Sequence, residues 1–307
     1  MPYGKDSPFL MTKKRKLAYL VLGINTIVWG LAAPAVKPAL AFISAEKFLF
    51  YRFLIASILC VPVLVWTFKS RKWKPGELVK VAGLELVGTT LILWMIYRAL
   101  SLTSAVETSL IYSTSPLFVI LAGIIFLKEK ETKREWRGLA MALAGTVLIT
   151  AEPLIAGQRS GSGSTTGNIL ILLQNLVWAG YLVAAKKVYR KLPKLGVTAI
   201  SFWVGMTSFF LLSLPQGNPF ASLTADWQIP AVQLAVLYMA IFGSIIGATT
   251  YLIGQNLIEV SEATVFTYAQ ALVALPAAMW FLGERLSPLA VVGIVIVAIG
   301  IYLTEKR

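Results

Sequence analysis

Long apolar runs follow one another along almost the whole chain. At about 17–25 residues, a run is long enough to cross the hydrocarbon core of a bilayer as a helix. We place ten runs at approximately residues 17–36, 46–68, 78–100, 105–127, 136–151, 167–188, 196–214, 230–256, 262–282 and 289–304. Because they are continuously apolar and too long for strands, they indicate bundled helices. The sequence therefore predicts an all-α membrane protein of ten transmembrane helices with no soluble domain.

The composition disfavours an enzyme. Hydrophobic residues make up 57% of the 307 residues and charged residues only 14%, far below the charge content of soluble domains. Histidine is absent, and the single cysteine, Cys60, excludes an internal disulfide and a cysteine metal cluster. Both aspartates, Asp6 and Asp226, lie outside the runs, so only Glu85 could serve the chemistry of an intramembrane enzyme, which makes that function a poor fit. We expect no enzymatic activity, no metal and no cofactor.

The net charge of +14 is unevenly divided between the two sides of the membrane. With a cytoplasmic N-terminus, ten spans place all 28 Lys and Arg residues in the cytoplasm except Lys37, Lys47, Arg52, Arg98, Arg159 and Arg285. This excess of cytoplasmic bases is the positive-inside rule. It predicts a multi-pass protein of the plasma or inner membrane with both termini in the cytoplasm, and it makes a nucleic-acid partner unnecessary.

Two segments of the chain repeat one another. FLKEKETKREWRG at 126–138 and FLGERLSPLAVVG at 281–293 share their Phe-Leu, Glu and Gly positions at a spacing of 155 residues. Further pairs at this spacing are Leu117/Leu272, Ala122/Ala277, Gly145/Gly300, Leu148/Leu303 and Glu107/Glu262. Near the start of each half the spacing is 149, which pairs Asn25 with Gln174 and Trp29 with Trp178. The chain therefore divides into two five-helix repeats, 1–155 and 166–307.

An odd number of spans in each repeat determines how the repeats are oriented. The second copy must enter the bilayer from the opposite side, which gives an inverted repeat. The charges agree, because the strongly basic segment 126–138 is cytoplasmic, whereas its weakly charged copy at 281–293 faces outside. The Gly/Ser-rich stretch 156–168 is predicted to be a flexible linker outside the membrane.

An ordered set of short motifs covers nearly the whole chain. The set consists of Trp29-Gly30 followed by Lys37, Arg52 in YRFLIAS, Pro116 in TSPLFVIL, and the FLKE and FLGE segments with their glycines. It resembles the EamA-type members of the drug/metabolite transporter superfamily. The resemblance implies a basket of ten helices around a central cavity, which usually exports amino acids, other metabolites or toxic amphiphiles. One departure is Ala271, which stands where Pro116 would recur, with Pro276 five residues later.

Transport is therefore the predicted function, with an amino acid, another metabolite or an organic cation as cargo and protons as a candidate coupling ion. Two halves in one chain fit alternating access. A facilitative uniporter or importer is the main alternative. A channel is disfavoured, because it would need a ring of like residues or a filter motif.

Glu85 lies within the third apolar run, where a carboxylate is costly unless it faces the bundle interior, pairs with a base or is protonated. On helical spacing it shares a small and polar face with Gly88 and Thr89, which suits the border of a cavity. Two interpretations follow. Glu85 either lines the substrate site and carries protons, as the only acid well inside a span, or it forms a structural ion pair with Lys80.

Polar residues gather at matching places in the fourth and ninth runs. Tyr112 and Ser113 precede Pro116, and Tyr268 and Gln270 lie in the corresponding part of the ninth run. Because proline lacks an amide hydrogen, Pro116 is predicted to free the carbonyl of Tyr112, which then needs a hydroxyl, a water or a substrate as partner. The two clusters favour a substrate site near the midplane, although serines also commonly hold helices together.

Asn25 and Trp29 correspond to Gln174 and Trp178 by the repeat. Each pair is spaced by four residues, so the amide and the indole share one helix face. Aromatic rings beside amides suit a zwitterion or a cation with an apolar body. The alternative, a place in the interfacial aromatic belt, is weakened by the depth of both tryptophans. Further candidates for the site are Trp94, Tyr97, Tyr181 and Tyr251.

Other features are interpreted as structural. Ser104 and Glu107 fit a capping box at the start of the fourth run, and Glu262 takes the same place in the ninth. Arg52 is expected to extend to the lipid headgroups, and GSIIG at 243–247 to allow close helix packing. The short fifth and tenth runs are predicted to be scaffold or a dimer face, which leaves a monomer and a homodimer both open.

Overall fold

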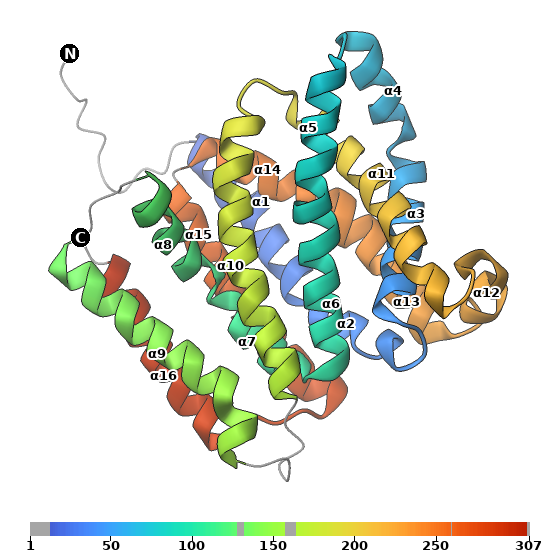
Figure 1. Ribbon diagram of the computed structural model, residues 1–307. Helices are drawn as coiled ribbons and strands as arrows, with labels where there is room; N and C mark the ends of the chain where they lie inside the picture. Colours follow the sequence, from blue (N-terminus) through green and yellow to red (C-terminus); the bar gives the residue numbers. More distant parts are fainter. Residues whose placement is uncertain (1–12, 128–131, 157–163, 259, 306–307) are drawn as a thin grey trace, which may run out of the picture.

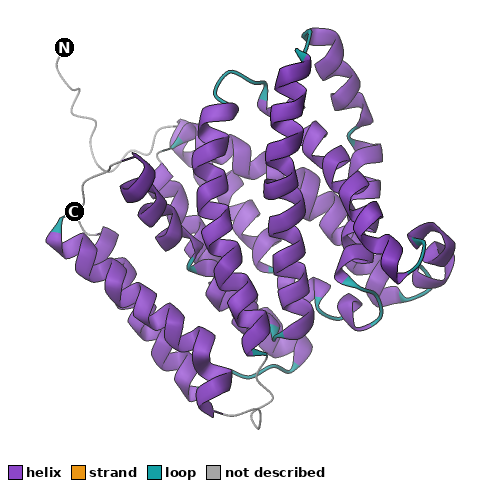
Figure 2. Cartoon of the chain, viewed as in Figure 1, coloured by secondary structure: helices purple, strands orange, loops and turns teal. Residues whose placement is uncertain are grey.

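The computed structural model describes residues 13–127, 132–156, 164–258 and 260–305. All regular secondary structure in these ranges is helical (Figure 2). The α-helices (Figure 1) are α1 (Lys13–Gly30), α2 (Ala32–Val36), α3 (Ala45–Leu59), α4 (Val61–Ser70), α5 (Pro75–Glu85), α6 (Ile92–Leu102), α7 (Ala105–Ser113), α8 (Ser115–Leu127), α9 (Lys133–Ala156), α10 (Thr165–Val188), α11 (Lys194–Ser213), α12 (Pro219–Asp226), α13 (Pro230–Leu237), α14 (Gly247–Leu257), α15 (Val260–Leu282) and α16 (Pro288–Glu305). The described residues also form the 3₁₀ segments η1 (Ala39–Ala41) and η4 (Leu214–Gln216), and the π-helical segments η2 (Leu86–Leu91) and η5 (Tyr238–Ile246).

Several of these helical stretches are long and apolar enough to cross a membrane. Among the described residues there are six: Lys13–Ala41, Pro75–Leu102, Ala105–Phe126, Thr165–Val188, Lys194–Gln216 and Pro230–Gly254. A seventh results if α3 and α4, which meet at an angle of 55°, form one span. The last two predicted runs fall on the shorter apolar helices Phe266–Leu282 and Pro288–Leu303, and the fifth falls on α9. The prediction of an all-α, multi-pass membrane protein is confirmed, and length and apolarity establish six or seven spans.

The span Ala105–Phe126, which is the fourth predicted run, is broken into two helices. α7 ends at Ser113, Thr114 takes up φ −83° and ψ −2°, and α8 begins directly afterwards. Pro116 lies in the first turn of α8, where its missing N–H is not needed by the helix. The break thus precedes the proline. The helix of the ninth predicted run differs, because α15 runs as one helix through Pro276.

The helical stretches of the third and eighth predicted runs each contain a widened turn, which the sequence did not predict. Segment η2 separates α5 from α6, and η5 separates α13 from α14. A shift of 155 residues moves 86–91 onto 241–246, which lies inside η5. The two wide turns therefore occupy matched positions. π-Helical turns are rare, and they are frequent at functional sites.

The helices of the two predicted repeats interleave. α1 packs along α14 and α15, and α10 packs along α6 and α8. α3 packs against α11, and α9 lies beside α16 at the lower left of Figure 1. The first helix of each predicted repeat therefore lies mainly against helices of the other one.

Glycines allow α9 and α16 to approach closely. A Cβ atom at Gly145 would lie 2.8 Å from the carbonyl oxygen of Gly293, and one at Gly300 would lie 2.6 Å from that of Gly138. Any side chain at these positions would push the two backbones apart. The fifth and tenth runs, predicted as scaffold or a dimer face, thus pack against each other.

The core is centred on α3. Residues 48–53 are all buried, so this part of the helix is enclosed on every side. Phe53 stacks on Phe209 of α11 with 5.8 Å between the ring centroids, and Phe48 stacks on Tyr97 of α6 at 5.4 Å. Every side chain in this stretch, including the charged one at Arg52, is therefore held inside the bundle.

Candidate functional site

Two side chains of helix α1 contact the widened turn η5 and the first residue of α14. Asn25 Nδ2 donates to the carbonyl oxygen of Gly247 at 2.9 Å, and Trp29 Nε1 donates to that of Gly243 at 3.0 Å. The amide and the indole share one face, as their spacing of four predicts. The Trp29 ring also packs on Tyr251, with 5.1 Å between the centroids. A Cβ atom at Gly247 would lie 2.4 Å from Trp29 Nε1, so close helix packing at 243–247 is confirmed.

Helix α10 makes a related contact with the widened turn of the third span. Trp178 stacks on Tyr181 at a centroid distance of 5.5 Å. The Tyr181 ring covers Gly88, where a Cβ atom would lie 2.2 Å from the ring. Gln174 is 1% exposed, and its Oε1 has no hydrogen-bond partner among the described residues. Near each widened turn an aromatic side chain therefore packs against a glycine, Trp29 against Gly247 and Tyr181 against Gly88.

Glu85 accepts three hydrogen bonds from hydroxyl groups. Its carboxylate, 2% exposed, receives Thr89 Oγ1 at 2.5 Å, Tyr181 Oη at 2.8 Å and Tyr189 Oη at 2.6 Å. The two tyrosines come from α10 and the turn that follows it, so the carboxylate ties α5 to α10. Burial and the neighbouring carboxylate raise the pKa of Tyr189, which therefore keeps its hydrogen for donation. The predicted ion pair with Lys80 is wrong, because hydroxyls satisfy the carboxylate instead.

Two further contacts join the spans at matched positions. Asn175 Nδ2 donates to the carbonyl oxygen of Ile111 at 2.8 Å, and Thr26 Oγ1 donates to that of Phe266 at 3.1 Å. Thr26 and Asn175 are 149 residues apart, and Ile111 and Phe266 are 155 apart, the two spacings of the repeat. At the break, the Ile111 carbonyl therefore accepts a side-chain donor from another helix, in addition to the Thr114 hydroxyl at 2.6 Å. The backbone N–H of Thr114 donates to the Ile111 carbonyl at 3.1 Å and is shared with the Tyr112 carbonyl, which was predicted to be freed.

Two of the candidates lie in local networks of their own. Trp94 Nε1 donates to Glu46 Oε1 at 2.8 Å, at the start of α3, and Gln216 Nε2 donates to the other carboxylate oxygen at 3.0 Å. Ser113 donates to the carbonyl of Leu110 within its own helix at 2.8 Å. Their polar groups are satisfied inside the protein.

The other candidates lie on α7 and α15. Tyr112 is half-buried and within electrostatic range of Tyr97. Tyr268 is half-buried, whereas Gln270 is 5% exposed and its Oε1 has no hydrogen-bond partner among the described residues. The structure thus brings Trp29 of α1 together with Tyr251 of α14, whereas Trp178 and Tyr181 lie beside each other on α10.

Comparison with known proteins assigns this architecture. The model of the EamA-like transporter family matches the chain twice, over residues 16–151 and 165–305. The chain belongs to the EamA-like transporter family. The protein is therefore a membrane transporter and not an enzyme.

Relatives of this EamA-like transporter match over nearly their full length. An uncharacterized transporter of Archaeoglobus fulgidus is 26% identical over 94% of this chain and 97% of its own. A probable terminal-alkyne amino-acid exporter of Streptantibioticus cattleyicolor is 25% identical, over 96% and 95%. A crystal structure with a TM-score of 0.63 and 19% identity covers 94% of this chain and 96% of its own, which shows a shared fold.

Arg52 of this EamA-like transporter does not reach the lipid headgroups. Its side chain is 7% exposed, and it donates from Nε to Ser244 Oγ at 2.9 Å and from Nη1 to Tyr97 Oη at 2.7 Å. The expected extension to the headgroups is wrong, because α3 is enclosed on all sides at this depth. The sequence could not show this, since Ser244 lies 192 residues further along the chain.

The EamA-like chain also buries more acids than the sequence indicated. Glu46, Glu107 and Glu152 are buried within helices, so Glu85 is not the only acid well inside the bundle. Ser104 caps α7 as predicted, because it accepts the backbone N–H of Glu107 at 3.0 Å. The Glu107 carboxylate, expected to return to the Ser104 amide, accepts the Thr103 hydroxyl. The side chain of Glu262 and the linker residues 157–163 lie outside the described residues.

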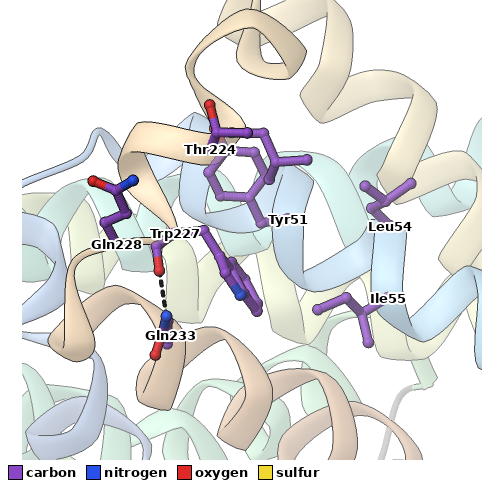
Figure 3. Close-up of a pocket in the computed structure, with 8 residues that line it drawn as sticks. Tyr51, Leu54, Ile55, Thr224, Trp227, Gln228 and Gln233 are labelled. Carbon is purple, nitrogen blue, oxygen red and sulfur yellow. Dashed lines mark hydrogen bonds between the residues drawn. The ribbon is translucent and has the colours of Figure 1, made fainter.

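A pocket of about 590 Å³ opens between α3, α12 and α13 (Figure 3). It is lined by Tyr51, Leu54, Ile55, Leu223, Thr224, Trp227, Gln228 and Gln233. The Tyr51 hydroxyl donates to Asp226 at 2.7 Å, and Gln233 donates to the carbonyl of Trp227. None of the candidate site residues lines this pocket.

Proposed function

We propose that the protein is a secondary transporter that exports amino acids, related small metabolites or toxic amphiphilic compounds by alternating access. Membership of the EamA-like family supports the transport, and the relative described as a probable amino-acid exporter supports this class of cargo and direction. The proposed location is the cell membrane, with both termini in the cytoplasm. The positive-inside distribution of bases supports this orientation.

The proposed architecture is ten transmembrane helices in two inverted repeats, 1–155 and 166–307. The observation that carries it is the pair of contacts from Asn175 to Ile111 and from Thr26 to Phe266, whose members are related by the spacings of the repeat. The matched widened turns in the third and eighth spans agree with it. In transporters built this way, substrate binds near the midplane beside discontinuous helices, and one part rocks against the other.

We place the cargo between the two widened turns. Trp29 and Tyr251 would offer aromatic surface on one side, and Trp178 on the other. The oxygens of Gln174 and Gln270 are buried and lack hydrogen-bond partners among the described residues. Because a buried acceptor is costly when unpaired, the ammonium group of a cargo molecule is a suitable partner for each of them. Tyr112 and Tyr268 complete the proposed lining, with Asn25 fixing α1 beside it.

Glu85 is the proposed proton carrier. In the ionised form it accepts hydroxyls from α10, so it holds α5 and α10 together. Protonation would remove part of this acceptor capacity and loosen the contact. Proton binding would in this way favour a conformation in which the two helices separate. A facilitative uniporter, in which Glu85 only holds the helices, is the alternative.

A liposome assay tests the proposed function. Purified protein would be reconstituted, and the flux of several amino acids and cationic dyes would be measured with and without an imposed pH step. We expect saturable flux that is accelerated by cargo on the opposite side, and none in protein-free liposomes. Non-saturable flux at channel rates, or no flux of any of these solutes through folded protein, would contradict the proposal.

A further inference from the structure

We infer that Arg52 binds the carboxylate group of the cargo, an inference that rests on the proposed transport function. The guanidinium lies in the enclosed part of α3, roughly two turns from the start of the helix at Ala45. At 7% exposure it is shielded from both lipid headgroups and water. An intramembrane charge at this depth normally marks a functional site and pairs with an opposite charge.

The protein offers Arg52 only neutral partners. The guanidinium donates to the hydroxyl oxygens of Ser244 and Tyr97. Its Cζ atom lies 5.2 Å from the ring centroid of Phe53 and 5.8 Å from that of Tyr97. The ion pairs found between described residues involve Lys47 with Asp226 and Arg71 with Glu77. Within the described part of the chain, the positive charge of Arg52 is therefore not neutralised by a carboxylate.

The guanidinium has capacity for an anion. An arginine carries five N–H donors in a planar fork that matches a carboxylate with two parallel hydrogen bonds. Its two hydrogen bonds to Ser244 and Tyr97 leave three of these donors. A buried charge that lacks an opposite charge is costly, and a bound carboxylate would remove that cost. The charge is thus available to contribute to binding.

Of the two hydroxyl groups beside Arg52, one is oriented so that it can donate a hydrogen bond to a bound carboxylate. The Ser244 hydroxyl donates its hydrogen to the carbonyl of Met239 at 3.0 Å, so it serves Arg52 only as an acceptor. The Tyr97 hydroxyl accepts from Arg52, and its own hydrogen has no acceptor among the residues that the structure describes. Tyr97 is held in place by stacking on Phe48. A carboxylate beside Arg52 would accept this hydrogen as well.

The position of Arg52 connects it with the proposed cargo site. Ser244 belongs to the widened turn η5 and directly follows Gly243, whose carbonyl accepts the Trp29 indole. The rings of Phe53 and Tyr97 lie beside the guanidinium, and Phe48 stacks on Tyr97. The aromatic surroundings accept an apolar body next to the anionic group. The class of ligand is therefore a small molecule with a carboxylate and an apolar side group, such as an apolar amino acid.

Equilibrium binding to the protein in nanodiscs tests this inference. The probes are L-leucine and L-phenylalanine, each compared with its methyl ester, which lacks the carboxylate charge. The variants are Arg52→Gln and, as a milder change that keeps the charge, Tyr97→Phe. The exposed Arg98→Gln serves as the control. The ester lacks the charged carboxylate and therefore loses a hydrogen bond to a charged group. We expect the wild type to bind the acid about 10- to 100-fold more tightly than its ester.

The decisive quantity is the ratio of the two affinities. We expect Arg52→Gln to bring the ratio close to one while ester binding persists, and Tyr97→Phe to lower it about tenfold, for the same reason. Arg98→Gln should leave it unchanged. If Arg52 were only structural, Arg52→Gln would weaken the binding of acid and ester equally. Alternatively, Arg52→Gln would fail to fold, and Tyr97→Phe would leave the affinity ratio unchanged. Either result overturns the inference.

Two further outcomes separate this inference from the proposed function. Flux and binding of cationic dyes without binding of either acid would overturn the carboxylate site and leave transport standing. Absence of flux and of binding for every compound would reject the proposed function, and the inference with it.

Sodium chloride is titrated alone in a separate experiment. If it stabilises the wild type but not Arg52→Gln, and the acid has no advantage over its ester, the site belongs to an inorganic anion.

Discussion

Asn175 donates a hydrogen bond of 2.8 Å to the carbonyl oxygen of Ile111, just before the fourth span breaks at Thr114. The amide comes from α10 and is fully buried. A helix that ends inside a bilayer leaves backbone carbonyls without their usual partners, and no water is present to replace them. The contact therefore stabilises the break and fixes α10 against α7.

We expect Asn175→Ala to destabilise the folded protein by about 0.5–1.5 kcal/mol, the net contribution of one hydrogen bond, because the Ile111 carbonyl keeps the N–H and the hydroxyl of Thr114 as donors. Thermal unfolding in detergent would measure the change. Ser101→Ala is a suitable control, because it removes an exposed hydroxyl bonded to a backbone carbonyl. Equal unfolding temperatures for the two variants would show that the contact contributes little.

We expect Gly88→Ala to impair transport. The added methyl group would lie 2.2 Å from the Tyr181 ring, so the ring must move and its hydrogen bond to Glu85 would be strained or lost. Overpacking of this kind costs about 1–3 kcal/mol. Gly83→Ala, with no atom within 4 Å of the added carbon, is the matched control and should keep full liposome flux. Normal flux in Gly88→Ala would show that this contact is dispensable.

We expect Trp29→Phe to weaken cargo binding. The variant keeps an aromatic ring beside Tyr251 but removes the donor to the carbonyl of Gly243, which loosens α1 on the widened turn. Trp280→Phe, at a side chain that is 84% exposed, should bind cargo like the wild type. Binding to protein in nanodiscs would compare the two. Unaltered affinity in both would move the cargo site away from α1.

We expect Glu85→Gln to allow exchange of cargo but to abolish uphill movement driven by a pH gradient, because an amide cannot carry the proton. Glu77→Gln, in the salt bridge with Arg71 near the start of α5, should retain pH-driven transport. Liposomes with an imposed pH step provide the measurement.

Two other results would redirect the assignment of coupling. If pH-driven transport survives in Glu85→Gln and is lost in Glu152→Gln, the proton site lies at the buried acids near Glu107, beside which Glu152 lies. If the wild type itself does not respond to the pH step, the protein is a uniporter.

We expect Lys72 and Lys133 to be cytoplasmic and Arg285 to face outside. Single cysteines at these positions, introduced after Cys60→Ser, would be treated in intact cells with an impermeant thiol reagent. The reagent should reach a cysteine at 285 and not those at 72 and 133. The reverse pattern would place the termini outside, and equal labelling at 133 and 285 would contradict the inverted arrangement.

Periodicity and the repeat predicted much of the fold. Continuous apolar runs identify membrane helices, because length and hydropathy suffice for that purpose. The spacing of Asn25 and Trp29 predicted their shared face, since the helical period alone determines it. Asn175 was missed, although it lies beside Gln174 and is the counterpart of the polar Thr26 by the repeat.

Other features depend on tertiary contacts. A π-helical turn inserts a residue without changing the apolar character of a span, so η2 and η5 leave no mark in the sequence. Arg52 was expected to extend to the headgroups. Its partner Ser244 comes from a distant part of the chain, so the sequence does not reveal the contact. The fifth run was predicted to end at residue 151, just before Glu152, whereas α9 extends to Ala156 and Glu152 is buried.

The glycine contacts between α9 and α16 have one more consequence. Gly145 meets Gly293, and Gly300 meets Gly138; adding 155 to Gly145 and Gly138 yields Gly300 and Gly293. The contact is therefore isologous, in the sense used for two-fold homodimers: each surface is complementary to a copy of itself. A single five-helix ancestor would have carried both sides of this interface and could have dimerised through it before any gene fusion.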